Sequence, residues 1–267
     1  MALVPVTREF FRDKRYRLPD NWQFARQDAV APVILQELPS LLPHMPIAFV
    51  NHDDQFVLVA VLGLAGQSNS FVSPEGIWLV DYRPLCYQFH PFSIRRADKS
   101  NHILCVEESC VVDPEDSGKP FFDVDLKPTM QVQSILESLG QFELNRERTS
   151  ALCKLLDEFG LLEEWPLKIR HVSSGGERDL GGLFRINRKS FDNLKADQLG
   201  KLHKSGSLLL IYAHFFSVRN LQKLGGGIGP QEPVRPYQAS AMKGTGVEQA
   251  DLDFFSLDES RISLEDL

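Results

Sequence analysis

The chain has 267 residues, of which 43% are hydrophobic and 24% are charged, proportions typical of a globular protein with one large domain or two small ones. The formal net charge of −7 is unevenly placed, because residues 248–267 carry seven acidic side chains and one arginine, which leaves −1 for the rest. A nearly neutral body does not indicate a large basic surface, so we expect no nucleic-acid partner.

No segment is expected to cross a membrane. The longest uninterrupted apolar run, residues 56–65, is about ten residues long and contains a glycine, whereas a membrane-spanning helix needs about 20 apolar residues. The four cysteines, Cys86, Cys105, Cys110 and Cys153, form no CxxC pair and lack the spacing of a zinc site. Because the N-terminus also shows no signal peptide, we expect reduced cysteines in a cytoplasmic protein.

The chain begins with a mildly basic segment, residues 1–20, which contains five lysine or arginine residues and three aromatic residues. We expect it to form a solvated, partly extended arm. Aromatic residues Trp22 and Phe24 follow, and leucines at helical spacing occupy residues 33–42. This stretch is expected to pack its aromatic side chains on a sheet.

Strand-like runs fill residues 46–112. They number four or five, each about 5 to 8 residues long, are rich in Val, Ile and aromatic residues, and are separated by Asn, Asp, Gly and Pro. The segment from Asn51 to Gln55 has the composition of a hairpin turn. This region is expected to form the core of a globular domain.

Helical spacing of apolar residues begins after Thr129, which has the side chain of a helix N-cap. Gly140 is expected to end or interrupt this helix. A second helix is expected to stop at Gly160.

Two further strands and a long helix are expected in the last third of the chain. The strands are residues 165–172 and 183–186, and a helical tract starts after Asn187. Gly206 breaks that tract, and apolar residues at helical spacing then cover residues 207–224. That helix is expected to be buried along one side.

The order of these elements predicts a single α+β domain, residues 21–224, with a largely antiparallel sheet packed by the helices of the C-terminal half. Residues 1–20 would be the basic arm, and residues 225–267 a flexible, disordered acidic tail. The glycine-rich run at residues 225–230 lacks the ending of a phosphate-binding loop and follows a helix. In the tail, acidic residues alternate with hydrophobic ones such as Phe254 and Leu264, which is typical of a segment that docks on a partner; a solvated tail without a target is the alternative.

One pair of residues has the spacing of a metal site. His52 and Asp54 form an HxD motif, as in iron sites made by two histidines and one carboxylate, and the third ligand would come from His171 or His214. Ordinary turn chemistry accounts for the same residues without a metal. Apart from this alternative, we expect no cofactor.

The block from Trp78 to Pro84, followed by Pro91 and Phe92, is denser in aromatic residues and proline than a plain strand. Because proline cannot donate to a sheet ladder, the intervening residues 85–90 are expected at a sheet edge or in a bulge. The aromatic side chains would either line a binding surface or fill the core. The candidate ligand- or partner-binding residues are Trp78, Tyr82, Arg83, His90, Phe92 and His214.

His214 has two interpretations. It lies one turn before Ser217 in the helix expected at residues 207–224, as a base and a nucleophile would. No nucleophile elbow and no acid motif accompany the pair, so a histidine with satisfied hydrogen bonds at a packing interface is the simpler interpretation.

Several short motifs follow one another between residues 20 and 224. They are Trp22-x-Phe24-Ala25, Pro46-Ile47, Leu62-Gly63-Leu64, Asn69-x-Phe71, Trp78 with Tyr82-x-Pro84, Pro91-Phe92, Leu104-Cys105-Val106, Leu183-Phe184-Arg185-Ile186 and Tyr212-Ala213-His214. In order and spacing this set resembles the SapC family, named for a protein associated with the bacterial surface layer and distinct from the peptide-transporter permease of the same name.

The resemblance implies a bacterial protein, a link to the surface layer, and genes that neighbour those of TonB-dependent receptors and flavin-dependent halogenases. It implies no catalytic residues. Where the family has an arginine-rich approach to the Pro-Phe pair, this chain has Gln88-Phe89-His90. From the resemblance and the residues together, we expect an accessory or binding protein that acts through contacts with a partner protein. The edge around Tyr82 to Phe92 and the acidic tail would be its contact surfaces. The alternative is an enzyme, either a non-haem iron oxygenase using the HxD motif and a distant histidine or an unknown transferase with a pocket near Trp78 and Tyr82.

Overall fold

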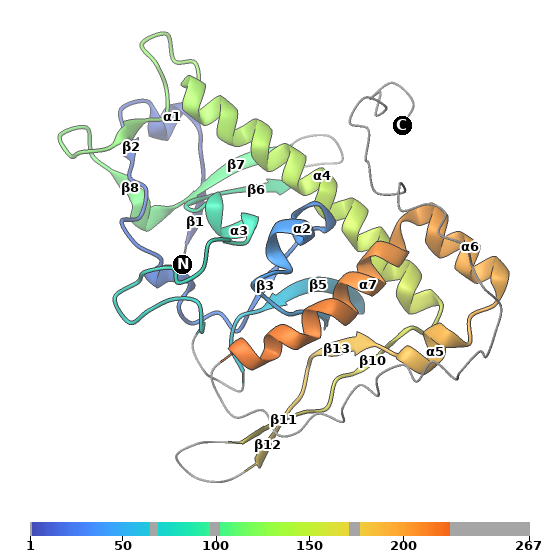
Figure 1. Ribbon diagram of the computed structural model, residues 1–267. Helices are drawn as coiled ribbons and strands as arrows, with labels where there is room; N and C mark the ends of the chain where they lie inside the picture. Colours follow the sequence, from blue (N-terminus) through green and yellow to red (C-terminus); the bar gives the residue numbers. More distant parts are fainter. Residues whose placement is uncertain (1, 65–68, 97–101, 171–176, 225–267) are drawn as a thin grey trace, which may run out of the picture. The chain divides into compact units, whose positions relative to one another are not determined.

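The computed structural model describes residues 2–64, 69–96, 102–170 and 177–224 (Figure 1). These residues belong to one compact unit, Met1–Gly229, which combines helices with strands that pair antiparallel. The predicted α+β class with a largely antiparallel sheet is therefore confirmed. The expected acidic tail, residues 225–267, lies outside the described residues.

The larger sheet has five strands. They are β3 (Val30–Pro32), β4 (Ile47–His52), β5 (Gln55–Val61), β10 (Leu162–Glu164) and β13 (Phe184–Ile186), in the spatial order β10-β13-β4-β5-β3. A hairpin joins β4 to β5, and its two turn residues, Asp53 and Asp54, have φ values of 49° and 59°. Two successive positive φ values are those of a type I′ turn, whose twist matches that of paired strands. The turn predicted between Asn51 and Gln55 is confirmed.

A second sheet contains three strands: β1 (Leu3–Pro5), β6 (Phe92–Arg96) and β7 (His102–Glu107). The middle strand is β7, and its register pairs Val106 with Phe92. Just beyond this pair, the amide of Glu107 donates to the carbonyl of Pro91 at 2.9 Å. This register brings the residues that precede β6 beside those that follow β7.

Two small sheets complete the strand set. One places β2 (Arg15–Tyr16) between β8 (Val111–Val112) and β9 (Lys119–Pro120), and the other pairs β11 (Leu167–Arg170) with β12 (Glu177–Leu180). The strand predicted at residues 165–172 is thus present as β11, while residues 171–172 lie outside the described residues.

The described residues form two hydrophobic cores. The larger one lies around the five-stranded sheet, and the smaller one lies beside β6 and β7. Phe11 and Tyr16 are buried in the smaller core, where their rings contact Phe121 and Phe92 with centroid distances of 4.9 Å each. The expectation of a solvated arm is therefore wrong for these two residues, because their rings gain more by burial among aromatic neighbours than by exposure.

One long helix, α4 (Met130–Glu158), runs along both sheets (Figure 1). Its N-cap is Thr129, as predicted, whose side chain accepts a hydrogen bond from the amide of Val132. The break predicted at Gly140 is wrong, because Gly140 lies inside one continuous helix of 29 residues. A glycine inside a helix costs about 1 kcal/mol. Burial of Val132 and Leu139 in the smaller core and of Cys153 and Leu156 in the larger one, on the two sides of the glycine, offsets that cost.

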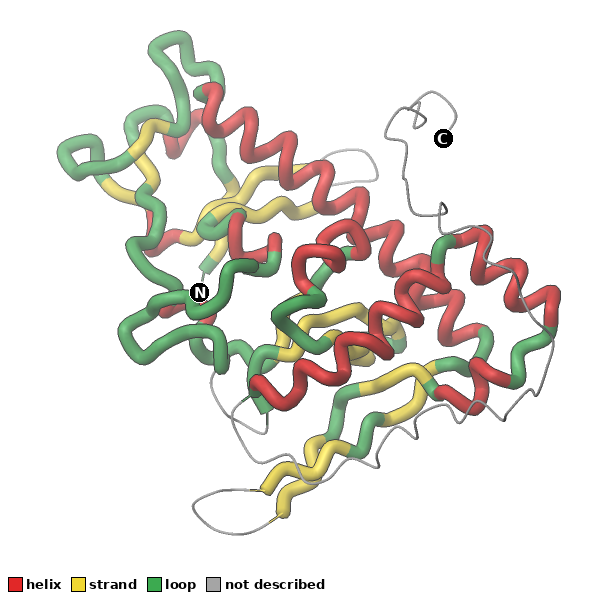
Figure 2. The backbone as a smooth tube through the Cα atoms, viewed as in Figure 1, coloured by secondary structure: helices red, strands yellow, loops and turns green. Residues whose placement is uncertain are grey.

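Three helices follow in the C-terminal half: α5 (Arg188–Asp192), α6 (Ala196–Ser205) and α7 (Ser207–Ser217), with a 3₁₀ turn at Val218–Lys223 (Figure 2). Gly206, with φ of 81°, separates α6 from α7, as predicted. The hydroxyl of Ser217 accepts a hydrogen bond from the amide of Ile47 at 3.0 Å, which ties α7 to β4. The predicted packing of C-terminal helices on the sheet is confirmed.

The remaining helical segments are short. They are α1 (Arg8–Phe11), α2 (Leu38–Leu41), α3 (Leu85–Gln88) and the 3₁₀ turns η1 (Gln23–Ala25), η2 (Leu35–Glu37) and η3 (Glu108–Cys110). Within the described ranges, no helix has both the length and the apolar character that a membrane crossing requires.

Candidate functional site

A hairpin-like loop between β5 and α3 carries the aromatic block predicted from the sequence. An isolated bridge pairs Val72 with Trp78, and the amide of Ser73 donates to the carbonyl of Ile77 at 2.8 Å. Gly76 makes the turn with φ of 84°, and its carbonyl accepts from the amide of Trp22 at 2.8 Å. The loop is therefore attached to the segment around Trp22.

Trp78 anchors this loop in the larger core. Its ring is buried and lies 5.9 Å from that of Trp22 and 5.8 Å from that of Tyr87. The indole Nε1 donates to the carbonyl of Tyr82 at 2.8 Å. Because both its ring and its polar atom are engaged inside the protein, Trp78 holds the loop in place and does not face a partner.

A buried carboxylate, Glu37, fixes the other end of the loop. Only 3% of this residue is exposed. Its Oε2 accepts hydrogen bonds from the Tyr82 hydroxyl at 2.8 Å and from the Leu85 amide at 2.9 Å, while its Oε1 accepts from the Ile34 amide at 2.9 Å. Burial raises the pKa of Glu37, and these hydrogen bonds oppose that shift. Three donors thus compensate for taking a carboxyl group out of water.

The loop exposes two large apolar side chains. Ile77 and Leu79 alternate with the buried Trp78 and are 62% and 57% exposed. Four residues further along the chain, the guanidinium of Arg83 lies over the ring of Trp22, 4.9 Å from its centroid. We call Trp22, Ile77, Leu79 and Arg83 the apolar loop surface.

His90 lies behind this loop. Its ring stacks on that of Phe24, with centroids 3.8 Å apart and planes 11° apart. Burial lowers the pKa of His90, and the neighbouring Glu107 partly reverses the shift. Phe92, two residues further on, is buried in the smaller core and therefore does not reach the surface.

Among the described residues, the group with ligand atoms close enough to hold a metal is His90, Glu107 and Cys110. The HxD motif and the distant histidine are not brought together. The His52 side chain is 79% exposed in the β4–β5 turn beside Asp54, whereas His214 is buried. The other proposed ligand, His171, lies outside the described residues. The structure therefore gives no support to the iron site.

His214 lies inside the larger core, with 1% of its surface exposed. Its ring centroid is 5.4 Å from that of Trp165 and 5.9 Å from those of Phe49 and Phe215. Neither ring nitrogen has a hydrogen-bond partner in the described part of the chain. Burial lowers the pKa of His214 to about 3, and the charge of Arg185 acts in the same direction. A partner cannot contact this side chain in the folded protein, and the expectation that its hydrogen bonds are satisfied does not hold.

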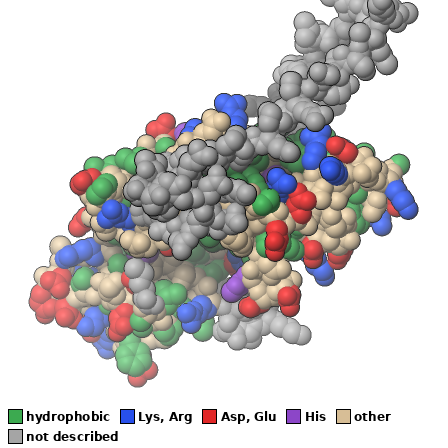
Figure 3. Space-filling model, turned by 90° about the horizontal axis from the view of Figure 1, so that it is seen from below, with side chains coloured by type: hydrophobic (Ala, Val, Ile, Leu, Met, Phe, Trp, Pro, Cys, Tyr) green, Lys and Arg blue, Asp and Glu red, His purple; other side chains and the backbone are tan. Residues whose placement is uncertain are grey.

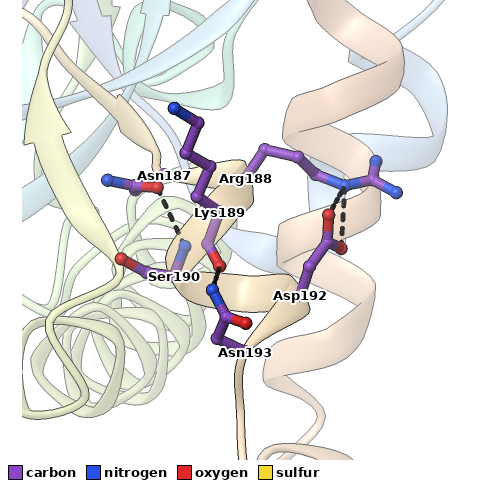
Figure 4. Close-up of polar contacts among 6 residues, drawn as sticks. All are labelled: Asn187, Arg188, Lys189, Ser190, Asp192 and Asn193. Atoms are coloured by element: carbon purple, nitrogen blue, oxygen red, sulfur yellow. Dashed lines mark hydrogen bonds and ion pairs between the residues drawn. The ribbon is translucent and has the colours of Figure 1, made fainter.

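A second exposed apolar area lies on α7, where Leu209, Tyr212 and Phe216 point outwards. Next to it, α5 is fixed by polar contacts, including the ion pair between Arg188 and Asp192 and the Asn187 side chain that accepts from the Ser190 amide (Figure 4). We call Leu209, Tyr212 and Phe216 the α7 stripe. It is a useful internal comparison for the apolar loop surface.

Charge is distributed evenly over the face shown in Figure 3, where basic and acidic side chains are interspersed. The described part of this face therefore has no extended area of one charge that could attract an oppositely charged partner.

A family model described as SapC matches residues 6–224. The chain belongs to the SapC family. Comparison with curated proteins gave no match, and comparison with solved structures gave none. The residues matched by the SapC model include the apolar loop surface, Glu37 and the group around His90.

Sequence reasoning located the loop of this SapC-family chain but missed its most informative residues. Glu37 gives no signal in the sequence, since two of its three donors, Tyr82 and Leu85, lie 45 and 48 positions away. Glu107 and Cys110 are joined to His90 only through the β6–β7 register. The one available signal was the alternation Ile77, Trp78, Leu79, which predicts two side chains on the face opposite to the buried tryptophan.

Proposed function

We propose that this SapC-family chain is an accessory protein that binds a partner protein through the apolar loop surface. The observation that carries the proposal is the pair Ile77 and Leu79, both largely exposed on a loop whose ends are fixed by Trp78 and Glu37. A single exposed aliphatic side chain needs no explanation. Ile77 and Leu79 instead project together from one face of the loop, opposite the buried Trp78.

The loop is held in one conformation before a partner binds. Binding a flexible loop costs entropy for each residue that becomes ordered, whereas a loop already held in one conformation avoids much of this cost. Trp and Arg are also the residue types that contribute most to binding at protein interfaces. Trp22 and Arg83, stacked on each other, are suited to such contacts.

We propose further that the partner links this chain to a surface-layer or outer-membrane uptake system from the cytoplasmic side, and that the acidic tail, residues 225–267, adds a second contact to that partner. The family resemblance supports this partner class, and the alternation of acidic and hydrophobic residues supports the role of the tail. The protein itself would act in the cytoplasm. All four cysteines are unpaired, as is usual in a reducing compartment.

Replacing Ile77 and Leu79 together by aspartate is expected to weaken partner binding at least about 100-fold. Each aliphatic side chain contributes about 1.5–3 kcal/mol when buried, and the new charges oppose burial. The full-length tagged protein would be used to capture partners from the organism of origin, with quantitative mass spectrometry of the bound proteins.

The matched control replaces Leu209 and Phe216, in the α7 stripe, by aspartate. It adds the same charge to an equally exposed apolar area, and its bound proteins should equal those of the unchanged chain. If the loop variant retains every bound protein while the control loses them, the contact surface lies on α7 and the proposal is wrong. Thermal unfolding of both variants checks that they are folded.

A further inference from the structure

Three side chains with different metal-binding atoms meet at the end of the β6–β7 hairpin. One ligand atom each from His90, Glu107 and Cys110 lies within 4.8 Å of the other two. The imidazole Nε2 of His90 is 3.5 Å from Oε2 of Glu107. Zinc bonds of about 2.0–2.3 Å in tetrahedral geometry put neighbouring ligand atoms roughly 3.3–3.8 Å apart. The nitrogen and the oxygen therefore already have the spacing of two zinc ligands.

Separate contacts hold each of these residues in position. The Glu107 amide donates to the carbonyl of Pro91, next to His90, at 2.9 Å, and the stacking of His90 on Phe24 fixes the imidazole plane. The carbonyl of Cys110 accepts a hydrogen bond from the amide of Arg17 at 2.9 Å. A site whose ligands are held before the metal arrives loses less entropy on binding.

The Glu107 carboxylate is buried and faces the imidazole of His90. Its Oε1 accepts a hydrogen bond from the Ser109 hydroxyl at 2.8 Å, and its Oε2 faces His90. In the described part of the chain, no lysine or arginine pairs with it. Buried carboxylates are normally paired with a cation or coordinate a metal, so this position lacks a positive charge that a metal ion would supply.

We propose that His90, Glu107 and Cys110 bind a zinc ion. A thiolate and an imidazole select zinc over magnesium or calcium, which prefer oxygen ligands. Three protein ligands leave the fourth tetrahedral position for water or for a ligand atom from a bound molecule. None of these three ligands belongs to the apolar loop surface. The zinc proposal can therefore be wrong while the partner-binding proposal is right, and the reverse.

Cobalt(II) titration of the metal-free, reduced, full-length protein tests the site, because cobalt reports the ligand type in its absorption spectrum. We expect one cobalt ion per chain with a thiolate-to-cobalt charge-transfer band, and displacement of that cobalt by zinc. Cys110→Ser should abolish the band. His90→Gln should weaken zinc binding at least about 100-fold, since even partners outside the ligand set contribute about 10–100-fold.

The matched control is Cys105→Ser, on the same hairpin two residues from Glu107. The Cys105 thiol donates to the carbonyl of Ile103 at 3.8 Å and is not one of the three clustered ligands, so this variant should keep the band and the affinity. A spectrum without a thiolate band, or equal bands in the Cys110→Ser variant and the unchanged chain, would overturn the proposal. Weak cobalt binding without the thiolate band also counts against the proposal, because the acidic residues 248–267 alone would give that result.

Discussion

Glu37→Gln is expected to lower the free energy of unfolding by about 1–3 kcal/mol. Glutamine has the same shape, but one carboxylate oxygen becomes an amide nitrogen. In either orientation this nitrogen faces at least one of the donors that now point at Glu37, namely the amides of Ile34 and Leu85 and the Tyr82 hydroxyl. A buried donor without an acceptor costs about 1–3 kcal/mol. Urea unfolding of the two proteins measures the difference.

The same change should loosen the loop that carries the apolar loop surface. Amide hydrogen exchange across residues 71–85 is expected to accelerate in Glu37→Gln. Tyr82→Phe is the matched control, because it removes one donor and leaves the carboxylate its two amide partners, so its effect should be smaller. Equal stability and unchanged exchange in Glu37→Gln would show that Glu37 does not fix the loop.

His214→Phe is expected to remove the part of the loss of stability between pH 6.5 and pH 3 that this histidine causes. The pKa of His214 is about 3 in the folded protein and 6.5 in its ordinary state, so the unfolded chain binds a proton that the folded chain excludes. The stability that this group contributes is present above pH 6.5 and is lost as the pH falls towards 3. The slope is about 1.4 kcal/mol per pH unit, or about 5 kcal/mol over the whole range.

The measurement is the free energy of unfolding of both proteins at a series of pH values. Subtracting one stability curve from the other removes the contributions of groups that titrate in both proteins, such as Glu37. At neutral pH the phenylalanine should be tolerated, because Phe49, Trp165 and Phe215 already surround the ring. His52→Gln, at an exposed histidine, should keep the original curve. Parallel curves for the unchanged chain and His214→Phe would mean that His214 is not buried in the neutral form.

The parts of the fold that were predictable depend on local chemistry. The Asp53-Asp54 turn, the Thr129 cap and the break at Gly206 each follow from the residue at that position. The continuity of α4 through Gly140 was not predictable. It depends on the two cores against which the helix packs on either side of Gly140, and the distant residues that complete these cores are not visible in the local sequence.

In the candidate site too, local chemistry was predictable and the effect of distant residues was not. The sequence pointed to Trp78 and Tyr82, but it did not distinguish the side chains that anchor the loop from Ile77 and Leu79, which face outwards. Alternation along a strand predicts which residues share a face, yet only the sheet and its neighbours decide which face is buried. Glu37 escaped notice for a similar reason, since the Leu85 amide that it accepts from is 48 residues away.

The most direct test of the proposed function is site-specific photo-crosslinking in the living organism of origin. A photoreactive phenylalanine derivative would replace Leu79 in the full-length chain, and in a parallel strain it would replace Leu209 in the α7 stripe. The account predicts a discrete crosslinked protein at position 79 that is absent at position 209. No crosslinked protein at position 79, or the same products at both positions, would contradict the claim that the apolar loop surface binds a partner.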